Sequence, residues 1–172
     1  MAMTLVSTVQ VPSGGAASIE FTGIAGTGKD LLVLFSGRSA ANNQNRALSI
    51  QVNSNTSDIY TTLRLEGTGS TVGTNKLSPG SGVPQILINS GQQGTATTAN
   101  TFSNVAIYFA NYASSANKSI SADAVTENNA TQAYQSIYAA LAATTAAITS
   151  IKLYDDGSTF AQHTSASLYI VS

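Results

Sequence analysis

The stretch whose spacing comes closest to a ligand-binding motif is the glycine-rich segment Gly23–Asp30, GIAGTGKD. It matches a phosphate-binding loop at every fixed position except the last, where Asp30 stands in place of the Ser or Thr that contacts Mg²⁺. A phosphate-binding loop also opens a helix, whose first amides cradle the phosphate. Here the apolar run Leu31–Phe35 follows, which is typical of a strand. We therefore interpret Gly23–Asp30 as a connection between strands and not as a nucleotide site.

The chain contains one histidine, His163, and no cysteine. His163 is the only candidate base for a Ser–His–Asp triad, and no G-x-S-x-G motif accompanies it. With no cysteine and no second histidine, zinc sites and a Cys–His pair are excluded. We expect His163 to be a surface residue at the edge of a strand.

Two pairs of carboxylates have the chemistry of a Ca²⁺ site or of glycosidase acids. Asp123 and Glu127 lie four residues apart in a strand-like segment and therefore share a face, whereas Asp155 and Asp156 lie in a turn. Neither pair has the spacing of a known Ca²⁺ loop. We interpret them as solvated carboxylates and turn-forming aspartates. The sequence thus assigns no catalytic, cofactor-binding or metal-binding residue, and we expect a protein that is not an enzyme.

Charged residues make up 9% of the chain, against about 25% in an ordinary soluble domain. The net charge is −1, and the seven basic residues are scattered: Lys29, Arg38, Arg46, Arg64, Lys76, Lys118 and Lys152. Nucleic-acid binding needs several phosphates neutralised together, so this distribution argues against it. A small net charge gives little electrostatic protection against association, so the composition is compatible with a homo-oligomer as well as with a monomer.

At 172 residues the chain has the size of one domain, and we expect a single β-sandwich domain over residues 1–172. No stretch approaches the roughly 20 apolar residues of a membrane span. The first residues, MAMTLVS, lack the basic and apolar regions of a signal peptide. We expect a soluble protein, made in the cytoplasm, without a membrane partner.

The segment Phe102–Tyr138 sets the fold class, because buriable and polar residues alternate along it in three strand-like runs. One face of the three runs carries Val105, Ile107 and Phe109, then Ile120, Ala122 and Ala124, then Tyr134, Ser136 and Tyr138. The polar breaks ASSAN and NNAT between the runs are typical of the turns of an antiparallel meander.

Alternation or apolar runs predict further strands at Thr4–Val11, Ser18–Thr22, Asp30–Ser39, Arg46–Asn53, Ile59–Glu66, Gln85–Ile88, Ile148–Tyr154 and Ser165–Val171. The unbroken run Leu31–Phe35 predicts a strand covered on both sides, and the Asp-Asp-Gly turn at 155–157 predicts a hairpin. Ala139–Ala147 is rich in the best helix former, yet alternation continues into it, so we interpret it as strand, turn and strand.

Two glycine- and serine-rich segments interrupt this pattern. Gly67–Gly82 is expected to form a long loop or a loose excursion at a sheet edge, and Gly91–Asn100 a polar loop. With ten or eleven strands and no convincing helix, the sequence predicts an all-β fold. We expect an antiparallel β-sandwich of jelly-roll type with long polar loops.

The segment from Asn111 to Ser172, with phrases such as NKSISADAVTENNATQAY, resembles the C-terminal half of small β-sandwich virion proteins of tailed bacteriophages. The phrases SIEFTGIAGTGKDLLVLFSGRS and YTTLRLEGTGS are similar to their N-terminal half, so the resemblance covers nearly the whole chain. Members of this group look like capsid decoration (cement) proteins in some phages and tail-fibre domains in others. The shared phrases are structural, so no catalytic residue carries over.

This resemblance implies a non-enzymatic virion protein, commonly a trimer, that binds the major capsid protein of the same phage at the capsid surface and stabilises the shell. The alternative is a tail-fibre or receptor-binding module that contacts host-surface glycans through Gly67–Gly82 and Gly91–Asn100. A third hypothesis, a carbohydrate-active enzyme that uses two of the eight carboxylates, is the least favoured.

Overall fold

Twelve strands form two antiparallel sheets in the part of the chain that the computed structural model describes, residues 2–78, 82–128 and 133–172. The larger sheet has the strand order β1-β12-β3-β8-β9-β10-β5-β6. Its strands are β1 (Met3–Gln10), β3 (Asp30–Gly37), β5 (Tyr60–Gly67), β6 (Val72–Leu77), β8 (Ser103–Phe109), β9 (Lys118–Glu127), β10 (Ala133–Ala142) and β12 (Ser165–Val171). The smaller sheet has the order β2-β11-β4-β7, with β2 (Ser18–Thr22), β4 (Asn45–Val52), β7 (Ile86–Gln93) and β11 (Ser150–Tyr154).

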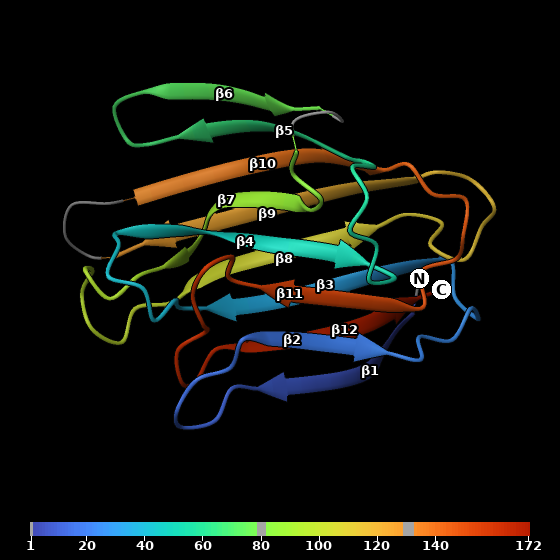
Figure 1. Ribbon diagram of the computed structural model, residues 1–172, viewed down its shortest axis with the longest axis horizontal. Helices are drawn as coiled ribbons and strands as arrows, with labels where there is room; N and C mark the ends of the chain where they lie inside the picture. Colours follow the sequence, from blue (N-terminus) through green and yellow to red (C-terminus); the bar gives the residue numbers. More distant parts are fainter. Residues whose placement is uncertain (1, 79–81, 129–132) are drawn as a thin grey trace.

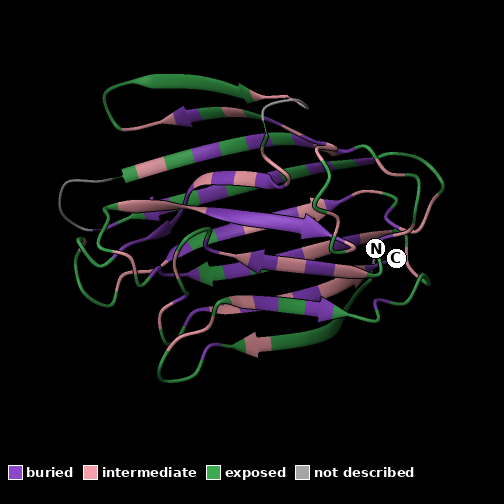
Figure 2. Ribbon diagram, viewed as in Figure 1, coloured by how far each residue is buried: buried purple, intermediate pink, exposed green. Residues whose placement is uncertain are grey.

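The smaller sheet covers one face of the larger sheet, so the predicted antiparallel β-sandwich is confirmed (Figure 1). Alternate side chains of facing strands meet in one core, for example Val33 of β3, Ile50 of β4 and Ile107 of β8, none of which is exposed. In Figure 2 this alternation appears as successive bands of buried and exposed residues along the strands. We call the face of the larger sheet that is turned away from the smaller sheet the outer face.

The meander predicted within Phe102–Tyr138 is confirmed, because β9 pairs antiparallel with β8 on one side and with β10 on the other. Its first turn follows β8, where Ser114 donates its backbone N–H to the carbonyl of Asn111 at 3.0 Å. Residues 129–131 of the second predicted turn, NNAT, lie outside the described residues. The meander therefore supplies three adjacent strands of the larger sheet.

The Ala-rich run Ala139–Ala147 is not helical, and its first part is a strand as predicted, but the second strand begins only at Ser150, after the run. β10 runs through Ala142, and residues 143–149 connect it to β11. Within β10 the Ala-rich part pairs with both β9 and β5, and Ala140 and Ala142 are buried on the core side. Pairing on both sides outweighs the helix propensity of alanine, which is only a weak preference.

Three local predictions are wrong. The turn at 155–157 does form, with Ser158 N–H donating to the Asp155 carbonyl at 3.1 Å, but it does not close a hairpin. It carries the chain from β11 in the smaller sheet to β12 in the larger one, because turn chemistry does not report which strands pair. The run Leu31–Phe35 is central in its sheet but covered on one side, since Leu34 is 39% exposed on the outer face. Residues 91–93 belong to β7 and not to a loop.

The strand count is also higher than predicted, and β6 accounts for the difference. This strand lies within Gly67–Gly82 and pairs only with β5, at the edge of the larger sheet. The edge excursion was one of the two predictions for this segment. Figure 2 shows β6, like β1 at the opposite edge, exposed over most of its length.

Burial of Tyr138 predicts a loss of stability in alkali. Its hydroxyl donates to the carbonyl of Asn89, and desolvation raises the pKa of Tyr138 from 10.0 to about 12. Because the folded state favours the neutral phenol, this stabilisation is complete below pH 10 and is lost as the pH rises from 10 towards 12. We expect the free energy of unfolding to fall by about 2–3 kcal/mol over that interval.

Urea unfolding of the wild-type protein and of Tyr138→Phe on either side of pH 10 tests this expectation. The Phe variant should show a flatter pH profile, because it has no phenol to ionise. Parallel profiles for the two proteins would contradict it.

Candidate functional site

The glycine-rich segment Gly23–Asp30 leads into β3 and not into a helix, as predicted. The Asp30 carboxylate accepts hydrogen bonds from the Tyr108 hydroxyl and from the N–H of Asn111, the latter at 2.7 Å. A side chain in place of Gly28 would meet Ile170 at 2.2 Å, so packing requires glycine there. The motif is therefore explained by local packing and by hydrogen bonds within the protein.

His163 is exposed, as predicted, but it lies in a turn before β12 and not at a strand edge. Its backbone adopts a φ of 72°, and its N–H donates to the carbonyl of Val11 at 3.1 Å. The backbone of His163 thus joins the start of the connection between β1 and β2 to the turn before β12.

The two carboxylate pairs have different surroundings. Asp123 and Glu127 are exposed on the outer face of β9, on one side of the strand as predicted. Asp155 and Asp156 form a turn, but Asp155 is buried, with only 3% of its surface exposed. The two aspartates thus form the predicted turn, but the sequence did not indicate that Asp155 is buried.

Arg46 is the partner of Asp155 that sequence reasoning missed. Its Nε and Nη2 lie 3.0 and 2.7 Å from Oδ1 of Asp155, and Nη2 also donates to the carbonyl of Asp156. The second carboxylate oxygen accepts from the hydroxyl of Ser39. This network joins β4, the end of β3 and the turn after β11, so its first effect is structural.

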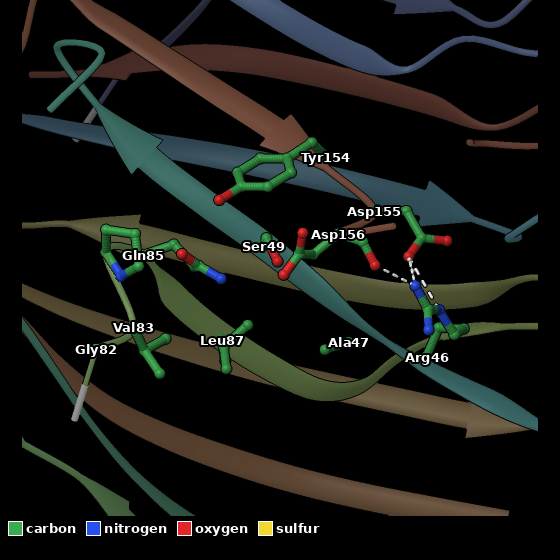
Figure 3. Close-up of a pocket in the computed structure, with 11 residues that line it drawn as sticks. Arg46, Ala47, Ser49, Gly82, Val83, Gln85, Leu87, Tyr154, Asp155 and Asp156 are labelled. Atoms are coloured by element: carbon green, nitrogen blue, oxygen red, sulfur yellow. Dashed lines mark hydrogen bonds and ion pairs between the residues drawn. The ribbon is translucent and has the colours of Figure 1, made fainter. Parts of the chain in front are cut away.

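A surface hollow of about 480 Å³ lies beside this network (Figure 3). Strands β4, β7 and β11, the segment before β7 and the turn after β11 supply its lining: Arg46, Ala47, Ser49, Gly82, Val83, Pro84, Gln85, Leu87, Tyr154, Asp155 and Asp156. Among the described residues of the two segments that were predicted to contact glycans, Gly82 is the one that contributes to it. A second hollow of about 470 Å³ shares Arg46 and Ala47 with the first.

The lining of the first hollow contains both hydrogen-bond donors and hydrogen-bond acceptors. The buried hydroxyl of Ser49 has no hydrogen-bond partner among the described residues. Desolvation, aided by the negative charge of Asp156, raises the pKa of Tyr154 from 10.0 to about 12. The Lys152 ammonium lies 5.6 Å from the centre of the Tyr154 ring. These groups suit a neutral polyhydroxyl ligand better than an anion.

The second hollow is lined by amides and by an ion pair. Arg64 Nη1 lies 3.1 Å from Oε2 of Glu66, which also accepts from the hydroxyl of Ser136 at 3.1 Å. Asn45 and Asn89 contribute amide side chains to the same hollow. The Glu66 carboxylate is committed to internal partners.

Arg38 orders the loop after β7, in the second segment expected to contact glycans. Its Nη1 donates to the carbonyls of Thr98 and Thr101 at 3.0 and 2.9 Å. Burial lowers the pKa of Arg38. Nη1 also donates to the hydroxyls of Thr97 and Thr101. An arginine that binds neutral carbonyls and hydroxyls leaves no sequence signal, because none of its partners is charged.

The outer face carries a second candidate surface, made of apolar side chains. In β5 the usual arrangement is inverted, since Leu63 and Leu65 are 50% and 43% exposed on the outer face whereas Thr62 and Glu66 are buried on the inner one. Neighbouring strands add Val72, Val125 and Ile137, which are 76%, 41% and 53% exposed. We call the five residues Leu63, Leu65, Val72, Val125 and Ile137 the outer patch.

Within residues 2–78, 82–128 and 133–172, no three His, Cys, Asp or Glu side chains gather into a group that could hold a metal ion. The same part of the chain has no helix long and apolar enough to cross a membrane. The sequence matches no known protein-family profile, and searches of curated proteins and of solved structures find no similar chain.

Proposed function

We propose that this chain is a non-enzymatic structural protein of a bacteriophage virion, a capsid decoration protein. In this proposal it binds the major capsid protein of the same phage on the outside of the shell. Each contact forms only with the assembled lattice, so binding stabilises the shell by mass action. Several copies joined in a homo-oligomer would bind with higher avidity than one copy.

The outer patch is the observation that carries this proposal. Exposed apolar side chains on neighbouring strands of one sheet mark a surface that a protein partner or a further copy of the chain covers. The outer face of this region consists of residues 121, 123 and 125 of β9 and the residues paired with them across β10 and β5. One of these residues is charged, Asp123. Such a surface fits a chain that acts by assembly.

The strand order supports the jelly-roll type of fold within this proposal. Eight strands form two sets, β1-β12-β3-β8 in the larger sheet and β2-β11-β4-β7 in the smaller. Along the chain these eight strands alternate between the two sheets except at β4 and β7, which are paired neighbours in the smaller sheet, and β5–β6 and β9–β10 are added to the larger one. We interpret them as a jelly roll with two inserted strand pairs. Viral capsid proteins and lectins both use this architecture, which is support by analogy of fold.

A second candidate function is a tail-fibre or receptor-binding module. The hollow of Figure 3 favours it, because Gln85 and Tyr154 contribute an amide and a hydroxyl group to its lining. Labelled protein that adheres to host cells, and loses adhesion in Tyr154→Ala, would support this function.

Copy number in purified virions tests the leading proposal. A decoration protein should be present in numbers comparable to those of the major capsid protein, and added protein should raise the temperature at which bare capsids disrupt. A handful of copies per particle would overturn the proposal in favour of the tail.

A further inference from the structure

The registers of the larger sheet place the outer patch on a regular grid. Reading across β9, β10, β5 and β6, one row is Ser121, Ala139, Leu63 and Lys76. The next row is Asp123, Ile137, Leu65 and Thr74, and the third is Val125, Gln135, Gly67 and Val72. All three rows lie on the outer face, because side chains two residues apart in a strand point the same way.

This grid is complementary to itself. Consider a second copy that lies face to face with the first, related to it by a two-fold axis that runs parallel to the strands between β10 and β5. Strand β10 then faces β5 of the second copy, and β9 faces its β6. Ile137 then lies opposite the second copy's Leu65, and Val125 opposite its Val72. A shallow hollow of about 270 Å³ at Gly67, which Leu65, Val72, Gln135 and Ile137 help to line, lies opposite the second copy's Gln135. Apolar side chains would therefore meet apolar side chains, and the second copy's Gln135 would meet the hollow.

The charges favour this position of the axis. Asp123 on β9 comes within one row of Lys76 on the second copy's β6, so the two opposite charges approach each other. An axis between β8 and β9 would bury more of the sheet, but it would bring the two Asp123 carboxylates close together. Burying like charges near each other is unfavourable.

The area available sets the strength of the contact. Four strands spaced about 4.8 Å apart, overlapping over eight residues, give roughly 500 Å² of flat surface per copy. Two copies thus bury about 1,000 Å², which is the lower limit for a specific interface. We expect a reversible dimer whose population rises with protein concentration.

From this complementarity we propose that the outer patch is buried against a second copy of this chain, face to face about a two-fold axis. A trimer, which the phage resemblance implies, needs each copy to present two different surfaces to its neighbours. A single flat patch that matches itself favours a pair. The unpaired edge strands β1 and β6 offer another route to association, and the variants below separate it from this one.

Sedimentation velocity at increasing concentration tests the proposal on the full chain. Wild-type protein should shift from monomer to dimer, and Ile137→Lys should remain monomeric over the same range. Leu5→Lys is the matched control, because Leu5 lies on the outer face of β1 and is 54% exposed, against 53% for Ile137. This control should dimerise like wild type. Far-UV circular dichroism and thermal melts should show that both variants fold.

A charge exchange tests the predicted register. Asp123→Lys and Lys76→Asp should each weaken dimerisation, and the double variant should restore it. Within one chain these positions lie three strands apart, about 14 Å, so restoration requires the second copy. The proposal is overturned if wild type stays monomeric, if it forms trimers, if Ile137→Lys dimerises normally, or if Leu5→Lys abolishes the dimer. It concerns self-association only, so virion copy number tests the decoration function separately.

Discussion

Replacing Asp155 by alanine should lower the free energy of unfolding by about 2–4 kcal/mol. The Asp155 side chain is fully buried, whereas that of its partner Arg46 is 27% exposed. Removing the carboxylate leaves the guanidinium with the Asp156 carbonyl as its remaining partner in this network, and it takes away the acceptor of the Ser39 hydroxyl. Partial exposure of Arg46 lets water replace some of the lost interaction, which keeps the loss below that of a wholly buried pair.

The neighbouring aspartate is the control for this prediction. Asp156 is exposed and contributes its backbone carbonyl, not its carboxylate, to the Arg46 network. Asp156→Ala should therefore change the free energy of unfolding by no more than about 0.5 kcal/mol. Thermal and urea unfolding of the two variants give the comparison. Equal losses for the two substitutions would show that the turn, and not the ion pair, determines stability here.

This pair of residues also marks how far the sequence predicts the site. Adjacent aspartates before a glycine predict a turn from local chemistry alone, and the turn is present. Which of the two is buried depends on Arg46, more than a hundred positions away in the chain. No local pattern carries that information, so the structural network at Asp155 and the hollow beside it could not be predicted.

The fold was more predictable than the site, because strand alternation is a local signal. The meander of β8, β9 and β10 follows directly from it. The predictions that failed depend on the sheet to which a strand belongs, which local alternation does not indicate. The β11–β12 turn joins two sheets, and the outer face of β3 and β5 stays uncovered although Leu34, Leu63 and Leu65 occupy it. Alternation gives two faces of a strand but does not say which neighbour covers each of them.

A second large loss of stability is expected from Phe160→Ala. Phe160 is fully buried, and its ring centre lies 5.5 Å from that of Phe35 in a tilted arrangement. Its backbone exchanges two hydrogen bonds with Ala16, at 2.8 and 3.1 Å. The residue therefore packs in the core against Phe35 of β3, and its backbone fastens the connection between β1 and β2. Truncation to alanine should lower the free energy of unfolding by about 3–5 kcal/mol, because it leaves a cavity.

Phe160→Leu separates packing from the backbone contacts in this prediction. Leucine keeps most of the buried volume and the same backbone, so it should cost distinctly less than alanine, about 1–2 kcal/mol. Urea unfolding of the three proteins gives the order wild type, Phe160→Leu, Phe160→Ala. Equal destabilisation of the two variants would show that the aromatic contact with Phe35 is the main contribution of Phe160 to stability. If neither variant were destabilised, the core would have closed around the cavity. Since Phe160 and Asp155 lie in the same crossing between the sheets, loss of either side chain should loosen the smaller sheet from the larger one before the meander unfolds.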